Sequence, residues 1–140
     1  LEALCAACAA TAMTATERVE LEAMHTAAAE LVRMGDVAAY REANDRFHEF
    51  IYTASHNRFL EETVLGVRRR VLPFRRAQFQ GLGRLVVSHA EHDRVVQALL
   101  RGDRDAAGRE MRAHLASSGR SFNELHDAGV EPTDALLVEV

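Results

Sequence analysis

Apolar residues recur at intervals of three and four positions along most of this chain, which is the spacing of helices that bury one face. Helix-forming residues dominate the positions between them, and only two prolines interrupt the pattern. The pattern predicts six helices, over residues 1–12, 15–34, 37–54, 58–79, 84–101 and 104–127. Because the connections between them are short, neighbouring helices should run antiparallel. We therefore predict an all-α fold, an antiparallel bundle of these six helices.

Capping residues support most of the predicted helix ends. Thr14 or Thr16 begins the second helix, and Glu17 stands three residues after Thr14, which is the spacing of a capping box. Glycine typically ends helices, and aspartate typically begins them. Two glycines close the second and fifth helices, and two aspartates open the third and sixth: Gly35, Gly102, Asp36 and Asp103.

Three segments should depart from regular helix. Pro73 lies inside the fourth predicted helix and lacks a backbone donor, so we expect a bend there. The sequence Gly81-Leu82-Gly83 favours a turn. Residues 128–140 carry a further glycine and proline and are expected to form a loosely ordered tail, which leaves residues 1–127 as a single domain.

Four polar side chains interrupt the apolar faces of three helices. Asn44 and His48 are one turn apart on the face that also carries Phe47, and His92 and His114 lie in the apolar faces of the last two helices. Leaving a buried polar group unpaired costs roughly 1–3 kcal/mol, so these groups need partners. Together they could hold a divalent metal ion in a central pocket. Hydrogen bonding within the core is the alternative reading.

Of the remaining histidines, one is a candidate for ligand contact and three are expected to be solvated. His89 lies one turn before His92 and is a candidate for contact with a ligand in the same pocket. His25, His56 and His126 lie near helix ends or on polar faces, where a solvated side chain is typical.

The fourth predicted helix adds two candidate ligand-binding residues, Arg68 and Arg75, which flank its apolar stripe. A guanidinium beside a pocket can pair with a carboxylate through two parallel hydrogen bonds. A solvated arginine face is the alternative for both residues. The stripe that they flank comprises Leu60, Val64, Val67, Val71 and Phe74.

Composition narrows the function classes. The net charge is −4, so we expect this chain to have no non-specific affinity for nucleic acid. No apolar stretch is long enough to cross a membrane and no signal peptide opens the chain, so we expect a cytoplasmic protein without membrane partners. Cys5 and Cys8 have no second cysteine pair, and we interpret them as small buried residues of a reducing compartment.

Several short segments recur in a distinctive order. They are Asn44-Asp45-Arg46-Phe47-His48, Ser55-His56-Asn57, Glu91-His92, Gly102-Asp103 and Met111-Arg112-Ala113-His114-Leu115. Together they resemble the FCD effector-binding domain of GntR-family bacterial transcription regulators, in the fatty-acid-regulator-like subfamily. The resemblance covers nearly the whole chain, to about Leu125.

The resemblance implies an antiparallel all-α bundle of six or possibly seven helices, and it implies a function as well. In many members a divalent metal, commonly zinc or nickel, is held at the positions of Asn44, His48, His92 and His114. A small organic carboxylate then binds to the metal as effector. Its occupancy alters how an amino-terminal winged helix-turn-helix domain sits on operator DNA, usually within a homodimer. Asn44 stands where aspartate is commoner, and its neutral amide should weaken metal binding.

That winged-helix segment is absent from the chain, which begins in mid-pattern with Leu1. We expect the chain to be part of a longer polypeptide and not to bind operator DNA by itself.

Two other functions remain open at this point. A metal-dependent hydrolase would need a general base, for which Glu110, one turn before His114, is the candidate. Glu110 could equally support the His114 imidazole. A metal-free helical dimerisation module is the other alternative. We favour the regulatory, non-enzymatic function.

Overall fold

The computed structural model describes the backbone of residues 1–76 and 82–127, and the side chains of residues 1–71 and 83–120. Within these ranges the chain forms helices and no strand, so the predicted all-α fold is confirmed. The predicted tail, residues 128–140, lies outside the described residues. The helices are α1 (Glu2–Ala12), α2 (Ala15–Met34), α3 (Val37–Thr53), α4 (Arg58–Arg76), α5 (Leu82–Leu100) and α6 (Arg104–Asp127).

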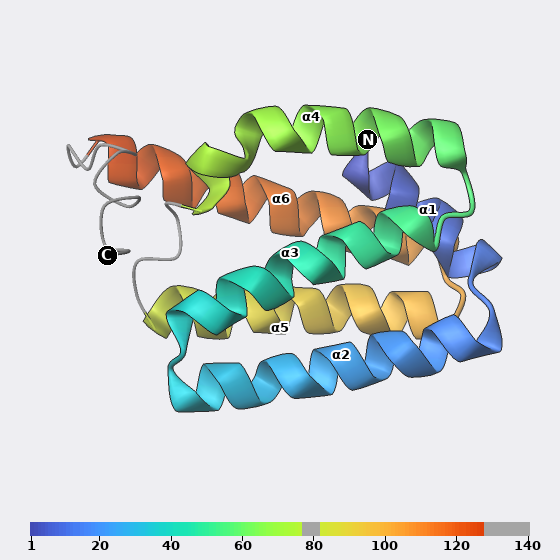
Figure 1. Cartoon of the computed structure of the whole chain (residues 1–140), viewed down its shortest axis with the longest axis horizontal. Helices are drawn as coiled ribbons and strands as arrows, with labels where there is room; N and C mark the ends of the chain where they lie inside the picture. Colours follow the sequence, from blue (N-terminus) through green and yellow to red (C-terminus); the bar gives the residue numbers. More distant parts are fainter. Residues whose placement is uncertain (77–81, 128–140) are drawn as a thin grey trace.

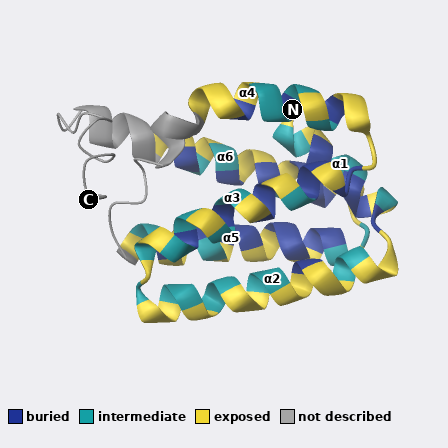
Figure 2. Ribbon diagram, viewed as in Figure 1, coloured by how far each residue is buried: buried dark blue, intermediate teal, exposed yellow. Residues whose placement is uncertain are grey.

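The helices form an elongated bundle in which α3, α5 and α6 occupy the middle (Figure 1). α2 packs along one side, against α3 and α5, and α4 packs along the other, mainly against α3. The short α1 lies against α6, α3 and α5. Figure 2 shows the consequence for burial, since the outer faces of α2 and α4 carry much of the exposed surface. The three middle helices are those that carry the inward polar residues.

Small residues set the close approach of α1 to α6. Cys5, Ala6 and Ala9 of α1 are completely buried in the core. A Cβ atom added to Gly108 of α6 would lie 3.3 Å from the Ala3 carbonyl oxygen, so only glycine fits there without a shift. Both cysteines are free thiols, and burial raises the pKa of Cys5 to about 11, which fits the structural role predicted for it.

Most predicted helix ends are confirmed by their hydrogen bonds. The backbone N–H of Glu17 donates to Thr14 Oγ1 at 3.2 Å, and the Thr14 N–H donates to Glu17 Oε2 at 2.7 Å, which completes the capping box. Gly35 ends α2 with φ of 70°, and Gly102 follows α5 with φ of 70°, the left-handed conformation that favours glycine. Asp36 and Asp103 accept backbone hydrogen bonds from the first turns of α3 and α6.

Two local predictions fared differently. The turn expected at residues 81–83 is wrong in part, because α5 already begins at Leu82. A Cβ atom added to Gly83 would contact nothing within 4 Å. A larger side chain at this position in the first turn of α5 would therefore gain no packing contact through its Cβ atom. Pro73 does not end α4, which continues to Arg76, and the ribbon changes direction near that end (Figure 1). Among the described residues, no helix combines the length and apolar character needed to cross a membrane.

Candidate metal centre

Three histidines from the three middle helices converge in the core. His48 from α3, His92 from α5 and His114 from α6 are 1%, 3% and 2% exposed. The Nε2 atom of His114 lies 3.3 Å from Nε2 of His48 and 3.3 Å from Nε2 of His92. The predicted inward placement of these imidazoles is therefore what the structure shows, and one nitrogen of each ring lies within 4.8 Å of the others.

These separations match those of imidazole ligands on one ion. Nitrogens that bind a tetrahedral zinc ion at about 2.0–2.1 Å lie about 3.3–3.4 Å from one another. The two Nε2 separations at His114 are both 3.3 Å. The three rings therefore need no large rearrangement to coordinate a single cation.

Glu91, on α5, supports the His114 ring from behind. Its Oε2 atom lies 2.9 Å from His114 Nδ1 and accepts further bonds from Arg84 at 3.2 Å and from Ser117. Burial raises the pKa of the Glu91 carboxyl, but the hydrogen bonds and the Arg84 charge outweigh burial and lower the pKa to about 2. An ionised carboxylate behind a ligand imidazole orients the ring and raises its basicity.

Glu2, on α1, lies in the equivalent place behind His48. Its Oε2 atom lies 3.0 Å from His48 Nδ1, which is within ion-pair distance. The two groups are not aligned as a hydrogen bond. The same carboxylate accepts a hydrogen bond from Tyr52 at 2.5 Å. Sequence reasoning missed both supporting carboxylates. Glu91 could have been found as the neighbour of His92, whereas Glu2 is distant from every ligand in the sequence.

The two carboxylates fix the protons of the rings that they face. An imidazole beside a carboxylate carries its proton on the facing nitrogen, which leaves the other nitrogen as a lone pair. His48 and His114 each face a carboxylate through Nδ1, a placement that favours the tautomer with Nε2 as the lone-pair nitrogen on both rings, and the two Nε2 atoms lie 3.3 Å apart. Two lone pairs at this separation repel unless a cation lies between them. The donor set therefore fits a divalent metal ion.

Burial also keeps the rings in the neutral form that binds metal. It lowers the pKa of His48 to about 3, even though Glu2 acts in the opposite direction. It holds the pKa of His92 well below the ordinary value, with added repulsion from the neighbouring His114 and His48. Neither ring must lose a proton near neutral pH before it coordinates an ion.

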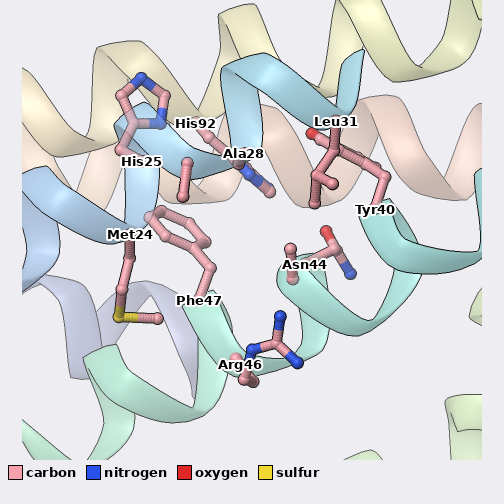
Figure 3. Close-up of a pocket in the computed structure, with 11 residues that line it drawn as sticks. Met24, His25, Ala28, Leu31, Tyr40, Asn44, Arg46, Phe47 and His92 are labelled. Carbon is pink, nitrogen blue, oxygen red and sulfur yellow. The ribbon is translucent and has the colours of Figure 1, made fainter. Parts of the chain in front are cut away.

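Asn44, the fourth predicted ligand, lies at the edge of this cluster. It is 8% exposed, one turn before His48, and lines a cavity of about 140 Å³ together with His92 (Figure 3). The His92 ring stacks on Phe47, with ring centroids 4.2 Å apart, which fixes the direction of its Nε2 atom. Coordination by the Asn44 amide stays a prediction.

Arg68, predicted to bind a ligand, is held by acidic partners. It is 4% exposed, and it donates to Asp45 Oδ1 at 2.6 Å and to the Tyr52 hydroxyl at 3.2 Å. The stripe predicted for α4 is therefore wrong in part. Val67 and Val71 are 46% and 38% exposed, because Arg68 faces the bundle, where Asp45 and Glu2 balance its charge. The side chain of Arg75 lies outside the described residues.

His89 and His25 form a stacked pair beside the cluster. Their ring centroids are 4.2 Å apart, and His25 Nε2 contacts Asp93 at 3.1 Å. The expectation that His25 is solvated is wrong, since its side chain is only 14% exposed and lines the cavity. Packing of α2 against α5 covers this ring. A ligand contact by His89 stays a prediction.

Glu110 does not support the His114 ring. It contacts Arg94 at 3.3 Å, and its side chain is 33% exposed, so it lies on the rim of the bundle. Glu91 takes that supporting place. Because α5 packs against α6, the Glu91 carboxylate lies 2.9 Å from His114 Nδ1. Glu110 is therefore a poor candidate for a general base at this centre.

Comparison with known proteins agrees with the geometry. No curated protein matches the chain. A family model described as the FCD domain matches residues 1–117, which is most of the chain. FCD domains are known to bind metal, and the buried triad of His48, His92 and His114 could hold an ion. The chain belongs to the FCD domain family, the effector-binding domains of GntR-family transcription regulators.

Proposed function

We propose that this domain senses a small organic carboxylate through a divalent metal ion, zinc or nickel, held by His48, His92 and His114 with Asn44 as a fourth ligand. The observation that carries the proposal is the convergence of three buried imidazoles, with the Nε2 atoms of His48 and His114 3.3 Å apart and a carboxylate near the Nδ1 atom of each of these two rings. Each carboxylate favours a lone pair on the Nε2 atom of the ring that it faces. A hydrogen-bonded core would instead need a proton between these two nitrogens.

Each residue has a distinct role in this proposal. A bound ion would supply an open coordination position for a carboxylate oxygen. Glu91 and Glu2 orient the rings of His114 and His48 and balance the charge of the ion. Arg68 keeps α4 against the centre through Asp45.

The coordinating residues come from three different helices. Binding of a ligand at the metal can therefore change how these helices are arranged. A ligand that binds one arrangement of α3, α5 and α6 better than another shifts the bundle toward that arrangement. We propose that the shift reaches a winged helix-turn-helix domain on the same polypeptide, which contacts operator DNA as a homodimer in the cytoplasm. FCD domains are regulatory and not an enzyme family. A non-enzymatic role is therefore proposed here.

Metal content and thermal stability test the proposal. We expect about one equivalent of zinc or nickel per chain after purification without chelator, and a fall in melting temperature when EDTA removes it. A ligand that binds only the folded state at a hundred times its Kd stabilises by about 2.7 kcal/mol. The His92→Gln variant keeps a polar side chain of similar length at the buried position and should lose the metal. His56→Gln, on an exposed histidine, should retain it.

The alternatives predict other results. A metal-free dimerisation module would carry no metal and melt at the same temperature with and without EDTA. A hydrolase would turn over generic esters, amides or phosphates in a zinc-dependent way. Either result would contradict the proposal.

A further inference from the structure

A cavity between α2 and α3 reaches the candidate metal centre. Its volume is about 140 Å³, and it shares Asn44 and His92 with that centre. Figure 3 shows both side chains among the residues that line the cavity. Any molecule that fills this space therefore lies next to two of the predicted metal ligands.

Small side chains on facing helices create the space. Ala27 and Ala28 of α2 stand across from Ala43 of α3, where longer side chains would close the gap. The other apolar lining residues are larger and lie around them. The apolar wall as a whole comprises Met24, Ala27, Ala28, Leu31, Ala43 and Phe47.

The cavity volume limits the size of its occupant. An apolar protein cavity of about 150 Å³ holds benzene, which has six non-hydrogen atoms. A cavity of about 140 Å³ has room for a molecule of similar size. A longer acyl chain would have to leave the cavity through its mouth or displace α2 or α3, because the surrounding interior is close-packed.

The chemistry of the lining limits the occupant further. Its polar lining residues are His25, Tyr40, Asn44, Arg46 and His92, whereas the other side chains that α2 contributes are apolar. A hydroxyl placed against the alanine wall would lose its hydrogen bonds to water without replacing them. Arg46 reaches the cavity from the surface, where its ion pair with Glu42 is long, 3.7 Å. An exposed guanidinium at the mouth attracts anions.

We propose that the effector is a short aliphatic monocarboxylate of about four or five carbon atoms, sized by this cavity. This inference rests on the proposed function, because the carboxylate group takes the metal end beside Asn44 and His92. The aliphatic tail lies against Ala27, Ala28 and Leu31. Sugar acids carry too many hydroxyl groups for this wall, and long fatty acids exceed its length.

Titration of the zinc-loaded protein with a series of acids tests the inference. The series runs through the straight-chain monocarboxylates from acetate to octanoate and adds succinate and gluconate, with binding measured by isothermal titration calorimetry. Each buried methylene should tighten binding about three- to fourfold up to butyrate or pentanoate. Affinity should stop rising for longer chains, gluconate should bind at least tenfold more weakly than butyrate, and succinate should not bind more tightly than butyrate.

Two variants make the test specific to the cavity. Ala28→Leu fills it and should weaken butyrate binding at least tenfold while zinc stoichiometry stays at one per chain. The matched control is Ala23→Leu, on an exposed face of the same helix, which should leave both quantities unchanged. Leu31→Ala enlarges the cavity and should move the optimum to longer acids, so the test survives if Ala28→Leu fails to fold.

The outcomes separate the two levels of the proposal. Zinc binding with a preference for octanoate, succinate or gluconate would overturn the inference and leave the metal centre intact. So would butyrate affinity that does not respond to Ala28→Leu. Absence of zinc from the wild-type protein would overturn the proposed function itself, and the inference with it.

Discussion

Acid should destabilise the metal-free domain well above the pH at which carboxylates titrate. The perturbation is a change from pH 7.0 to pH 5.5 in the presence of EDTA. His48 and His92 both have folded-state pKa values depressed by burial, to about 3 for His48. The unfolded chain, with ordinary histidine pKa values near 6.5, therefore binds protons first as the pH falls. Stability contributed by the neutral rings is present above pH 6.5 and is lost below it.

The magnitude follows from proton linkage. A histidine that titrates at about 6.5 when unfolded and stays neutral when folded loses about 1 kcal/mol of stability between pH 7.0 and 5.5. His48 and His92 together lose about 2–3 kcal/mol, because neither titrates in the native state over this range. For a domain of this size that is a fall in melting temperature of about 10 °C. His89, whose pKa is lowered by partial burial and by His25, adds to the same trend.

Thermal melts followed by circular dichroism at half-unit steps of pH give the slope directly. His92→Leu removes one titrating ring and should flatten the slope by about half, whereas His56→Asn alters an exposed ring and should leave it unchanged. Saturating zinc should raise the melting temperature but change the slope little, since His48 and His92 are already neutral in the folded domain before the ion binds. A melting temperature that stays constant between pH 7.0 and 5.5 in EDTA would refute the reasoning.

Three further predictions concern single residues. Glu91→Gln removes the charge behind His114 and should lower zinc affinity tenfold or more, measured by competition with a chromophoric chelator; unchanged affinity would exclude the supporting role. Arg18→Met removes charged hydrogen bonds to carbonyl groups at the ends of α1 and α5 and should cost about 2 kcal/mol in urea denaturation, a loss that a solvated arginine would not show. His56→Gly should stabilise the protein by about 0.5–1 kcal/mol, because residue 56 has φ of 50°, and destabilisation would show that its surface contact with Glu17 matters more.

The sequence was sufficient for the helices and for the inward histidines. Apolar spacing, caps and glycine positions are local properties, so they placed the ends of α2 at Thr14 and Gly35 as the structure has them. The same spacing placed His48, His92 and His114 on buried faces, since a helix face follows from a period of 3.6 residues. Where local signals were weak, as at residues 81–83, the predicted boundary was displaced.

Only the tertiary structure decided what surrounds these rings. Glu2 on α1 and His48 on α3 are separated along the chain by the whole of α2, and no spacing rule links them before α1 packs against α3. Arg68 and Val67 are neighbours on one helix, and the choice of which one faces the core depended on Asp45 lying opposite. The cavity against α2 likewise exists because alanines of two helices happen to face one another. Contacts of this kind depend on how helices are arranged in space, which the periodicity of a single helix does not encode.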